Sequence, residues 1–150
     1  MSQHITTRQL TADDSTHFAQ LVALFHVVFE NEHATIAPNT HLQQLLASRT
    51  FAVFVVFADD QLVGGCTTYM LPSYTSPYAE LLIYDLAIHP DFQRRGLGTR
   101  LIHTVRHYCA QHQIPLFFVL AHADDEPAVE FYRASGAHLE AVVNALYPLS

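Results

Sequence analysis

The chain is poor in cysteine and in positive charge. Its 150 residues include two cysteines, Cys66 and Cys109, and both lie in apolar segments. Two such residues indicate core positions or free thiols rather than a disulfide framework, and a reducing cytoplasm is the expected location. Seven basic residues stand against 14 acidic ones, which gives a formal net charge of -7. Nucleic-acid binding normally needs a basic surface, so no nucleic-acid partner is expected.

Long hydrophobic runs are missing as well. No apolar stretch reaches the ~18 residues that a membrane span needs, so we expect no membrane partner. The first residues, MSQHITTRQLTADD, lack the apolar centre of a secretory signal. Half of the residues are hydrophobic, which predicts one globular domain over residues 1–150 with a full core. The acidic balance is compatible with a cationic substrate, but by itself it favours the reading that acidity only helps solubility.

Histidine, by contrast, is abundant, with eleven residues in the chain. His103 and His107 have the i, i+4 spacing that can place two metal ligands on one helix face. No third ligand follows at a recognisable spacing. We therefore expect solvated histidines and no metal.

The apolar patterns predict a strand, two helices, three strands, and then helix, strand, helix, strand. Such an order indicates an α/β or α+β sandwich, with a mixed sheet and helices on both faces. Gly64 and Gly65 indicate a bulge or a bend in the third strand. Strands are expected over 4–10, 50–58, 62–71, 78–88, 114–122 and 137–149, and helices over 11–30, 39–48, 97–113 and 124–136.

The stretch LLIYDLAIHPDFQRRGLGTRL, residues 81–101, carries the clearest chemical signal. A glycine-containing loop that opens a helix offers unpaired backbone N–H groups and the positive end of the helix dipole, and both favour anions such as phosphate. Arg94 and Arg95 can add charge-assisted hydrogen bonds. A dinucleotide fingerprint would need a glycine at Leu101, and a Walker loop would need Gly-Lys-Ser/Thr. The loop alone is equally compatible with a structural turn that carries surface arginines.

Asp85 interrupts the apolar strand that precedes this loop. A buried carboxylate destabilises the fold unless it is paired. The strand alone favours an ion pair with a structural partner such as Arg8 or Arg49. The adjoining loop favours a functional carboxylate instead.

LAIHPDFQRRGLGTRLI resembles the acetyl-coenzyme A signature of the GCN5-related N-acetyltransferase (GNAT) superfamily, whose loop reads Gln/Arg-x-x-Gly-x-Gly/Ala. AVEFYRASGA is similar to a later segment of the family, a helix that carries a tyrosine before a glycine turn. The order of elements resembles this fold along nearly the whole chain. The resemblance implies a mixed, mostly antiparallel central sheet with helices on both faces.

A narrower resemblance points to one group within the superfamily. IYDLAIHPDFQRRGLGTRLI, DDEPAVEFY and SRTFAVFVVFADDQLVGG are similar to segments of the aminoglycoside 3-N-acetyltransferases. This likeness implies acetyl transfer from acetyl-CoA to an aminoglycoside, at its 3-amino group, in a ternary complex without an acyl-enzyme. It also implies a possible homodimer, because the group often forms dimers.

The resemblance assigns roles to the matching residues. Backbone N–H groups of the loop would hold the coenzyme pyrophosphate, and the end of the preceding strand would pair with the pantetheine arm. The residues expected to bind acetyl-CoA are Leu86, Ala87, Ile88, Gln93, Arg94, Arg95, Gly96, Leu97, Gly98 and Thr99. Tyr132 would lie near the sulfur as a catalytic residue.

Asp85 is expected to be catalytic and to meet the substrate ammonium. The other acids that could line the same cleft are Glu80, Asp124, Asp125 and Glu126, although each alone also reads as a solvated charge. Three further functions stay open: acetylation of a polyamine or other small amine, acetylation of a protein N-terminus, and a non-catalytic acyl-CoA sensor. A ping-pong route through Cys66 or Cys109 lacks an evident activating partner.

Overall fold

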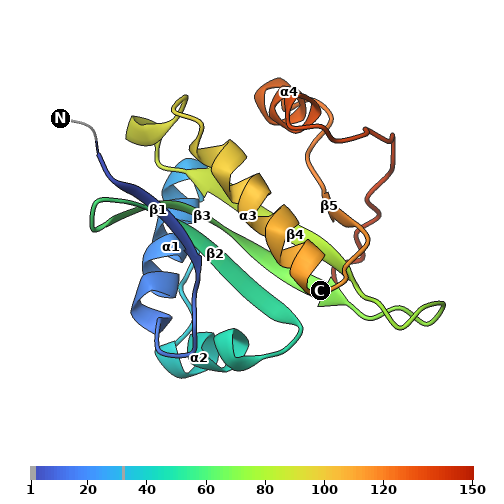
Figure 1. The fold of residues 1–150 in the computed structure, drawn as a ribbon, viewed down its shortest axis with the longest axis horizontal. Helices are drawn as coiled ribbons and strands as arrows, with labels where there is room; N and C mark the ends of the chain where they lie inside the picture. The colour runs from blue at the N-terminus through green and yellow to red at the C-terminus, as the bar shows by residue number, and fades with distance from the viewer. Residues whose placement is uncertain (1–2, 32) are drawn as a thin grey trace. The chain divides into compact units, whose positions relative to one another are not determined.

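The computed structural model describes residues 3–31 and 33–150 (Figure 1). No helix of these residues is both long and apolar enough to cross a membrane. The elements in chain order are β1 (Ile5–Gln9), α1 (Ser15–Val28), α2 (Asn39–Ala47), β2 (Phe51–Ala58), β3 (Gln61–Leu71), β4 (Glu80–Ile88), a short 3-10 turn (Pro90–Phe92), α3 (Leu97–Gln111), β5 (Phe117–Val119) and α4 (Glu126–Ala134).

The strands form one sheet in the order β1-β2-β3-β4-β5. The first four pair antiparallel, and β4 pairs parallel with β5. This arrangement confirms the predicted mixed, mostly antiparallel sheet of the GNAT fold. β5 is shorter than the nine residues that its apolar run predicted, because only three of its residues pair with β4.

Helices cover both faces of the sheet, as the sequence predicted (Figure 1). All eight residues of β2 are buried, and successive side chains of a strand point to opposite faces. Phe51, Val53, Val55 and Phe57 belong to a core cluster with α1 and α2. Phe54 points to the other face, where its ring meets Tyr108 of α3 edge-on at 5.2 Å. The continuous apolar run of β2 therefore results from burial on both sides.

Gly64 and Gly65 both lie in β3 where neighbouring atoms leave no room for a Cβ. The pairing of β2 with β3 shifts register beside Gly64, which confirms the predicted bulge. A Cβ atom on Gly65 would lie 2.7 Å from the Phe54 carbonyl oxygen and 2.8 Å from a methyl group of Leu21. Glycine is thus required at residue 65 by close packing.

The chain forms two compact units, residues 1–119 and 120–150. In the second unit, the side chain of Asp125 accepts a hydrogen bond from the Ala128 N–H at the start of α4. The predicted strand over 137–149 is wrong, because no residue after α4 is in a strand. Its apolar side chains, including Val143 and Tyr147, are exposed. A strand needs a hydrogen-bonding neighbour as well as a suitable pattern, and none pairs with this segment. That both units act as one domain stays a prediction.

The close packing at Gly65 predicts a loss of stability on adding a methyl group. Gly65→Ala should lower the free energy of unfolding by roughly 1–3 kcal/mol, the usual range for overpacking a core. The midpoint of urea unfolding measures the change. Gly98→Ala in the first turn of α3 is the matched control, and it should not destabilise because alanine favours helix. A Gly65→Ala protein as stable as the parent would contradict the packing argument.

Candidate functional site

Asp85 lies at an irregularity in β4. Thr67 of β3 is opposite Asp85, but the next residue, Thr68, is opposite Ile83. Tyr84 is therefore an extra residue in β4, which is the definition of a β-bulge. The Asp85 N–H donates to the Thr67 hydroxyl at 3.3 Å. This bond fixes the backbone where the strand bends.

The Asp85 carboxylate is half-buried and has no cationic partner among the described residues. Burial raises the pKa of this carboxyl above its ordinary value. Arg8, one of the two structural partners considered above, instead donates to both oxygens of Asp14 at 2.8 and 3.0 Å. The other, Arg49, is exposed and forms no ion pair with Asp85. The structural-pair reading is therefore wrong for Arg8 and gains no support from Arg49.

The strands β4 and β5 separate next to Asp85. They pair only over Leu81–Ile83 on β4, and β5 ends at Val119. Beyond the bulge, Leu86, Ala87 and Ile88 keep their pairing with β3 but have no strand neighbour on the β5 side within the described chain. Such an edge can hydrogen-bond an extended ligand in the manner of an added strand.

The loop between β4 and α3 brings backbone N–H groups together. Arg94 and Gly96 both have positive φ, 64° and 78°, in the left-handed region that glycine tolerates best. The first backbone bond of α3 runs from the Arg100 N–H to the Gly96 carbonyl at 3.1 Å. The N–H groups of residues 97–99 precede that bond and are the unpaired donors of a helix start. The loop thus has the geometry of an anion site.

Two side chains of this loop have contacts within the protein. The Gln93 amide donates to the Ile88 carbonyl at 3.0 Å, and its backbone N–H donates to the Pro90 carbonyl. Gln93 therefore anchors the loop to the end of β4. Arg95 lies 5.1 Å over the Phe92 ring and donates to Gln3. The side chains of Arg94 and Arg95 are both exposed.

Four of the predicted site residues belong to the second unit. Asp124, Asp125 and Glu126 are exposed at the start of α4. Tyr132 lies in α4, where its ring meets Phe131 at 5.2 Å. Their convergence on Asp85 stays a prediction. Glu80 begins β4, and the five residues to Asp85 correspond to roughly 16 Å of strand, so it lies at the far end of β4.

The residues that sequence reasoning missed are the neighbours of Asp85, namely Thr67, Tyr69 and Tyr84. The Tyr69 and Tyr84 rings meet edge-on at 5.6 Å. A signal for them was present in IYDLA, where two polar residues stand side by side in an apolar strand. A regular strand would point one of them into a buried face. Consecutive polar residues therefore indicate a bulge.

The cysteines are poor nucleophiles. Cys66 is completely buried, and burial raises the pKa of its thiol to about 12. Burial also raises the pKa of Cys109, to about 11. The thiolate is the reactive form of cysteine, so both residues act as core side chains.

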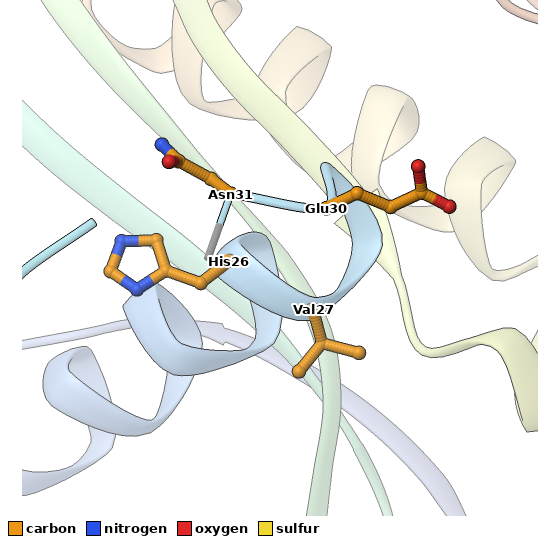
Figure 2. A pocket seen from close by; sticks show the side chains of 4 residues that line it. All are labelled: His26, Val27, Glu30 and Asn31. Carbon is orange, nitrogen blue, oxygen red and sulfur yellow. The ribbon is translucent and has the colours of Figure 1, made fainter. Parts of the chain in front are cut away.

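A shallow hollow lies at the end of α1, lined by His26, Val27, Glu30 and Asn31 (Figure 2). Figure 2 shows these side chains spread around the last turn of the helix. The hollow includes none of the predicted site residues, and it lacks the apolar walls typical of a small-molecule site. It is not the candidate site.

Comparisons with known proteins agree with this geometry. Residues 18–137 match the model of the acetyltransferase (GNAT) family. Among curated protein sequences, none matches the chain significantly.

Solved structures similar to this chain include aminoglycoside acetyltransferases. The acetyltransferase meta-AAC0020, from an uncultured soil metagenomic sample, was solved with sisomicin; it is 35% identical, with 97% of each chain covered and a TM-score of 0.95. The aminoglycoside acetyltransferase HMB0005, also from an uncultured soil metagenomic sample, is 26% identical, with 98% of this chain and 99% of that chain covered and a TM-score of 0.92. AAC(6')-Iy in complex with CoA shares the fold, at 15% identity, coverage of 100% and 98%, and a TM-score of 0.80.

The unpaired state of Asp85 predicts its effect on stability. Its folded pKa is above the unfolded value near 3.8, so ionisation destabilises the fold as the pH rises through the folded pKa. Asp85→Asn should therefore raise the melting temperature at pH 7–8, and the gain should shrink as the pH falls toward 3.8. Thermal unfolding at several pH values measures it.

Asp14→Asn is the control of opposite sign. In the parent, hydrogen bonds from Arg8 hold the pKa of the Asp14 carboxyl below its ordinary value. The Asp14→Asn protein should therefore be less stable than the parent at neutral pH. A destabilised Asp85→Asn protein at neutral pH would show that Asp85 has a stabilising partner.

Proposed function

We propose that this chain, which belongs to the GNAT acetyltransferase family, transfers the acetyl group of acetyl-CoA to an amino group of an aminoglycoside. The observation that carries the substrate class is the 35% identity, over 97% of both chains, to an acetyltransferase solved with sisomicin. The half-buried, unpaired Asp85 supports it, because a cationic amine would supply the missing partner.

Acetyl-CoA would bind along the open edge of β4 and the loop that follows. Backbone groups of Leu86, Ala87 and Ile88 would pair with the pantetheine arm, and the N–H groups of residues 94–99 would hold the pyrophosphate. Gly98 would allow the phosphates to approach the helix start. Gln93 would position the loop through its bond to Ile88.

Asp85 would bind the reacting ammonium and help to remove its proton. Only the neutral amine attacks the thioester carbonyl, so the ammonium must first lose a proton. Because the bound ammonium would lower the pKa of Asp85, the carboxylate would pass this proton on to water rather than keep it. The amine nitrogen then bonds to the carbonyl carbon, the C–S bond breaks, and the new amide nitrogen releases its second proton to water.

Tyr132 would donate a proton to the departing thiolate and would regain one from water. Direct transfer in a ternary complex is favoured over an acyl-enzyme, because the raised pKa values of Cys66 and Cys109 leave neither as a thiolate. The proposal uses no metal ion.

We further propose the 3-amino group as the acceptor, with Asp124, Asp125 and Glu126 binding other ammonium groups of the antibiotic. A protein with this activity would act in the cytoplasm and contribute to antibiotic resistance. A homodimer is part of the same proposal.

A panel of amines tests the substrate class. The parent should acetylate sisomicin- and gentamicin-type aminoglycosides, with product analysis giving the 3-N-acetyl compound and rates rising through neutral pH. Asp85→Asn should lower kcat/KM by ~10²-fold, the usual scale for a lost proton-transfer group. Release of CoA thiol measures turnover, and Asp13→Asn, an exposed acid before α1, is the control.

Two results would count against this function. Rapid acetylation of spermidine or a peptide, with no aminoglycoside acetylated, would show that the proposed substrate class is wrong. Binding of acetyl-CoA without turnover of any amine would favour the sensor.

The coenzyme loop is tested by a size series at Gly98. Acetyl-CoA should raise the melting temperature of the parent, because a ligand that binds the folded state stabilises it. Gly98→Val should abolish most of this rise by blocking the pyrophosphate, while the smaller Gly98→Ala should keep part of it. Circular dichroism confirms that both variants fold. Equal rises in the parent and in Gly98→Val would remove Gly98 from the coenzyme site.

A further inference from the structure

The bulge in β4 turns two successive side chains toward the same face of the sheet. Asp85 is opposite Thr67, which is itself opposite Val53 of the α1–α2 core cluster. Tyr84 meets Tyr69, which is opposite Phe51 of the same cluster. Residues directly opposite in a sheet share a face. Tyr84 and Asp85 therefore both lie on the α1–α2 face.

Three aromatic rings form a row that ends beside the carboxylate. The Phe51 and Tyr69 rings meet edge-on at 5.0 Å, and the Tyr69 and Tyr84 rings at 5.6 Å. Exposure rises along the row, from 5% for Phe51 to 37% for Tyr69 and 62% for Tyr84. The inner rings hold the outer one in place, and Tyr84 keeps much of its surface open to a ligand.

The row of rings lies beside the negative charge of Asp85, and no arginine of the described chain lies over Tyr69 or Tyr84. The charge of Asp85 is near enough to Tyr69 to help raise the pKa of that phenol, after the larger effects of burial and of Tyr84. Within the described chain, the arginines that lie over aromatic rings use Phe57, Phe92 and Phe117 instead. Ring faces beside an unpaired carboxylate suit an ammonium ion.

We propose that Tyr84, held by Tyr69, is a specificity-determining residue that contacts an ammonium group of the acceptor through its ring. This inference rests on the proposed function and adds to it a role for Tyr84, to which the family resemblance assigned none. Asp85 supplies the charge for the same cation, and the aromatic face adds contact that does not depend on a hydrogen bond. Aminoglycosides and linear polyamines are both polycationic amines, so the same ring contact would form with an ammonium group of either substrate.

The exposed position of Tyr84 permits a clean substitution series. Tyr84→Ala removes the ring, and Tyr84→Phe keeps the ring and removes the hydroxyl. Tyr74→Ala is the matched control, because Tyr74 is fully exposed in the segment between β3 and β4. Initial rates at varied sisomicin and varied acetyl-CoA give KM for each substrate, with spermidine as the second amine.

Tyr84→Ala should raise KM for sisomicin about tenfold, the scale of one partly desolvated cation–π contact. Its kcat and its KM for acetyl-CoA should change less than about threefold. Tyr84→Phe should stay within about threefold of the parent, and Tyr74→Ala should match it. Such a split would not follow from a purely structural role.

An unchanged KM for the amine in Tyr84→Ala would overturn the inference, and so would an equal rise in both KM values. A parent that acetylates spermidine but no aminoglycoside would overturn the proposed substrate alone. The ring contact would then stand or fall on the KM for spermidine, which should rise in the same way. A parent that acetylates neither amine would overturn both proposals.

Discussion

One extra residue in β4 is the constraint on which the rest of the site depends. Where Tyr84 is inserted, the strand bends, the Asp85 N–H bonds to the Thr67 hydroxyl, and pairing with β5 has already ended at Ile83. A regular strand in this position would continue its ladder and would place Tyr84 and Asp85 on opposite faces. The bulge thus creates an open strand edge and a polar face in one step.

The rigid part of the molecule that supports this irregularity is the pair β2 and β3. β2 is buried along its whole length, and Gly65 lets α1 pack directly on β3. The loop to α3 is fixed separately, by the bond of Gln93 to the end of β4. The candidate coenzyme edge and the candidate acceptor face therefore share one strand, and the distance between them is set by its backbone.

Local patterns in the sequence predicted the order of elements up to α4 and the helix start at the loop, because each depends on nearby residues. The pattern also located Asp85. Pairings between distant segments could not be read in this way. Arg8 found Asp14 rather than Asp85, and the alternation over 137–149 produced no strand. Tyr69 and Tyr84 were not predicted, because their contacts join β2, β3 and β4. Only the two consecutive polar residues in IYDLA indicated the bulge.

In the proposed function, Asp85 takes part both in binding the substrate ammonium and in proton transfer. Burial destabilises the ionised form of this carboxylate, and a nearby cation stabilises it. The substrate ammonium would therefore supply the positive charge that Asp85 lacks. The same cation would lower the pKa of Asp85 and would weaken it as a base while the ammonium is bound. The proton must therefore pass onward to water rather than stay on Asp85. Tyr84 fits this division of roles, because a ring face attracts the cation without itself accepting the proton. Attraction is then shared between ring and carboxylate, and the carboxylate remains free to exchange protons with solvent.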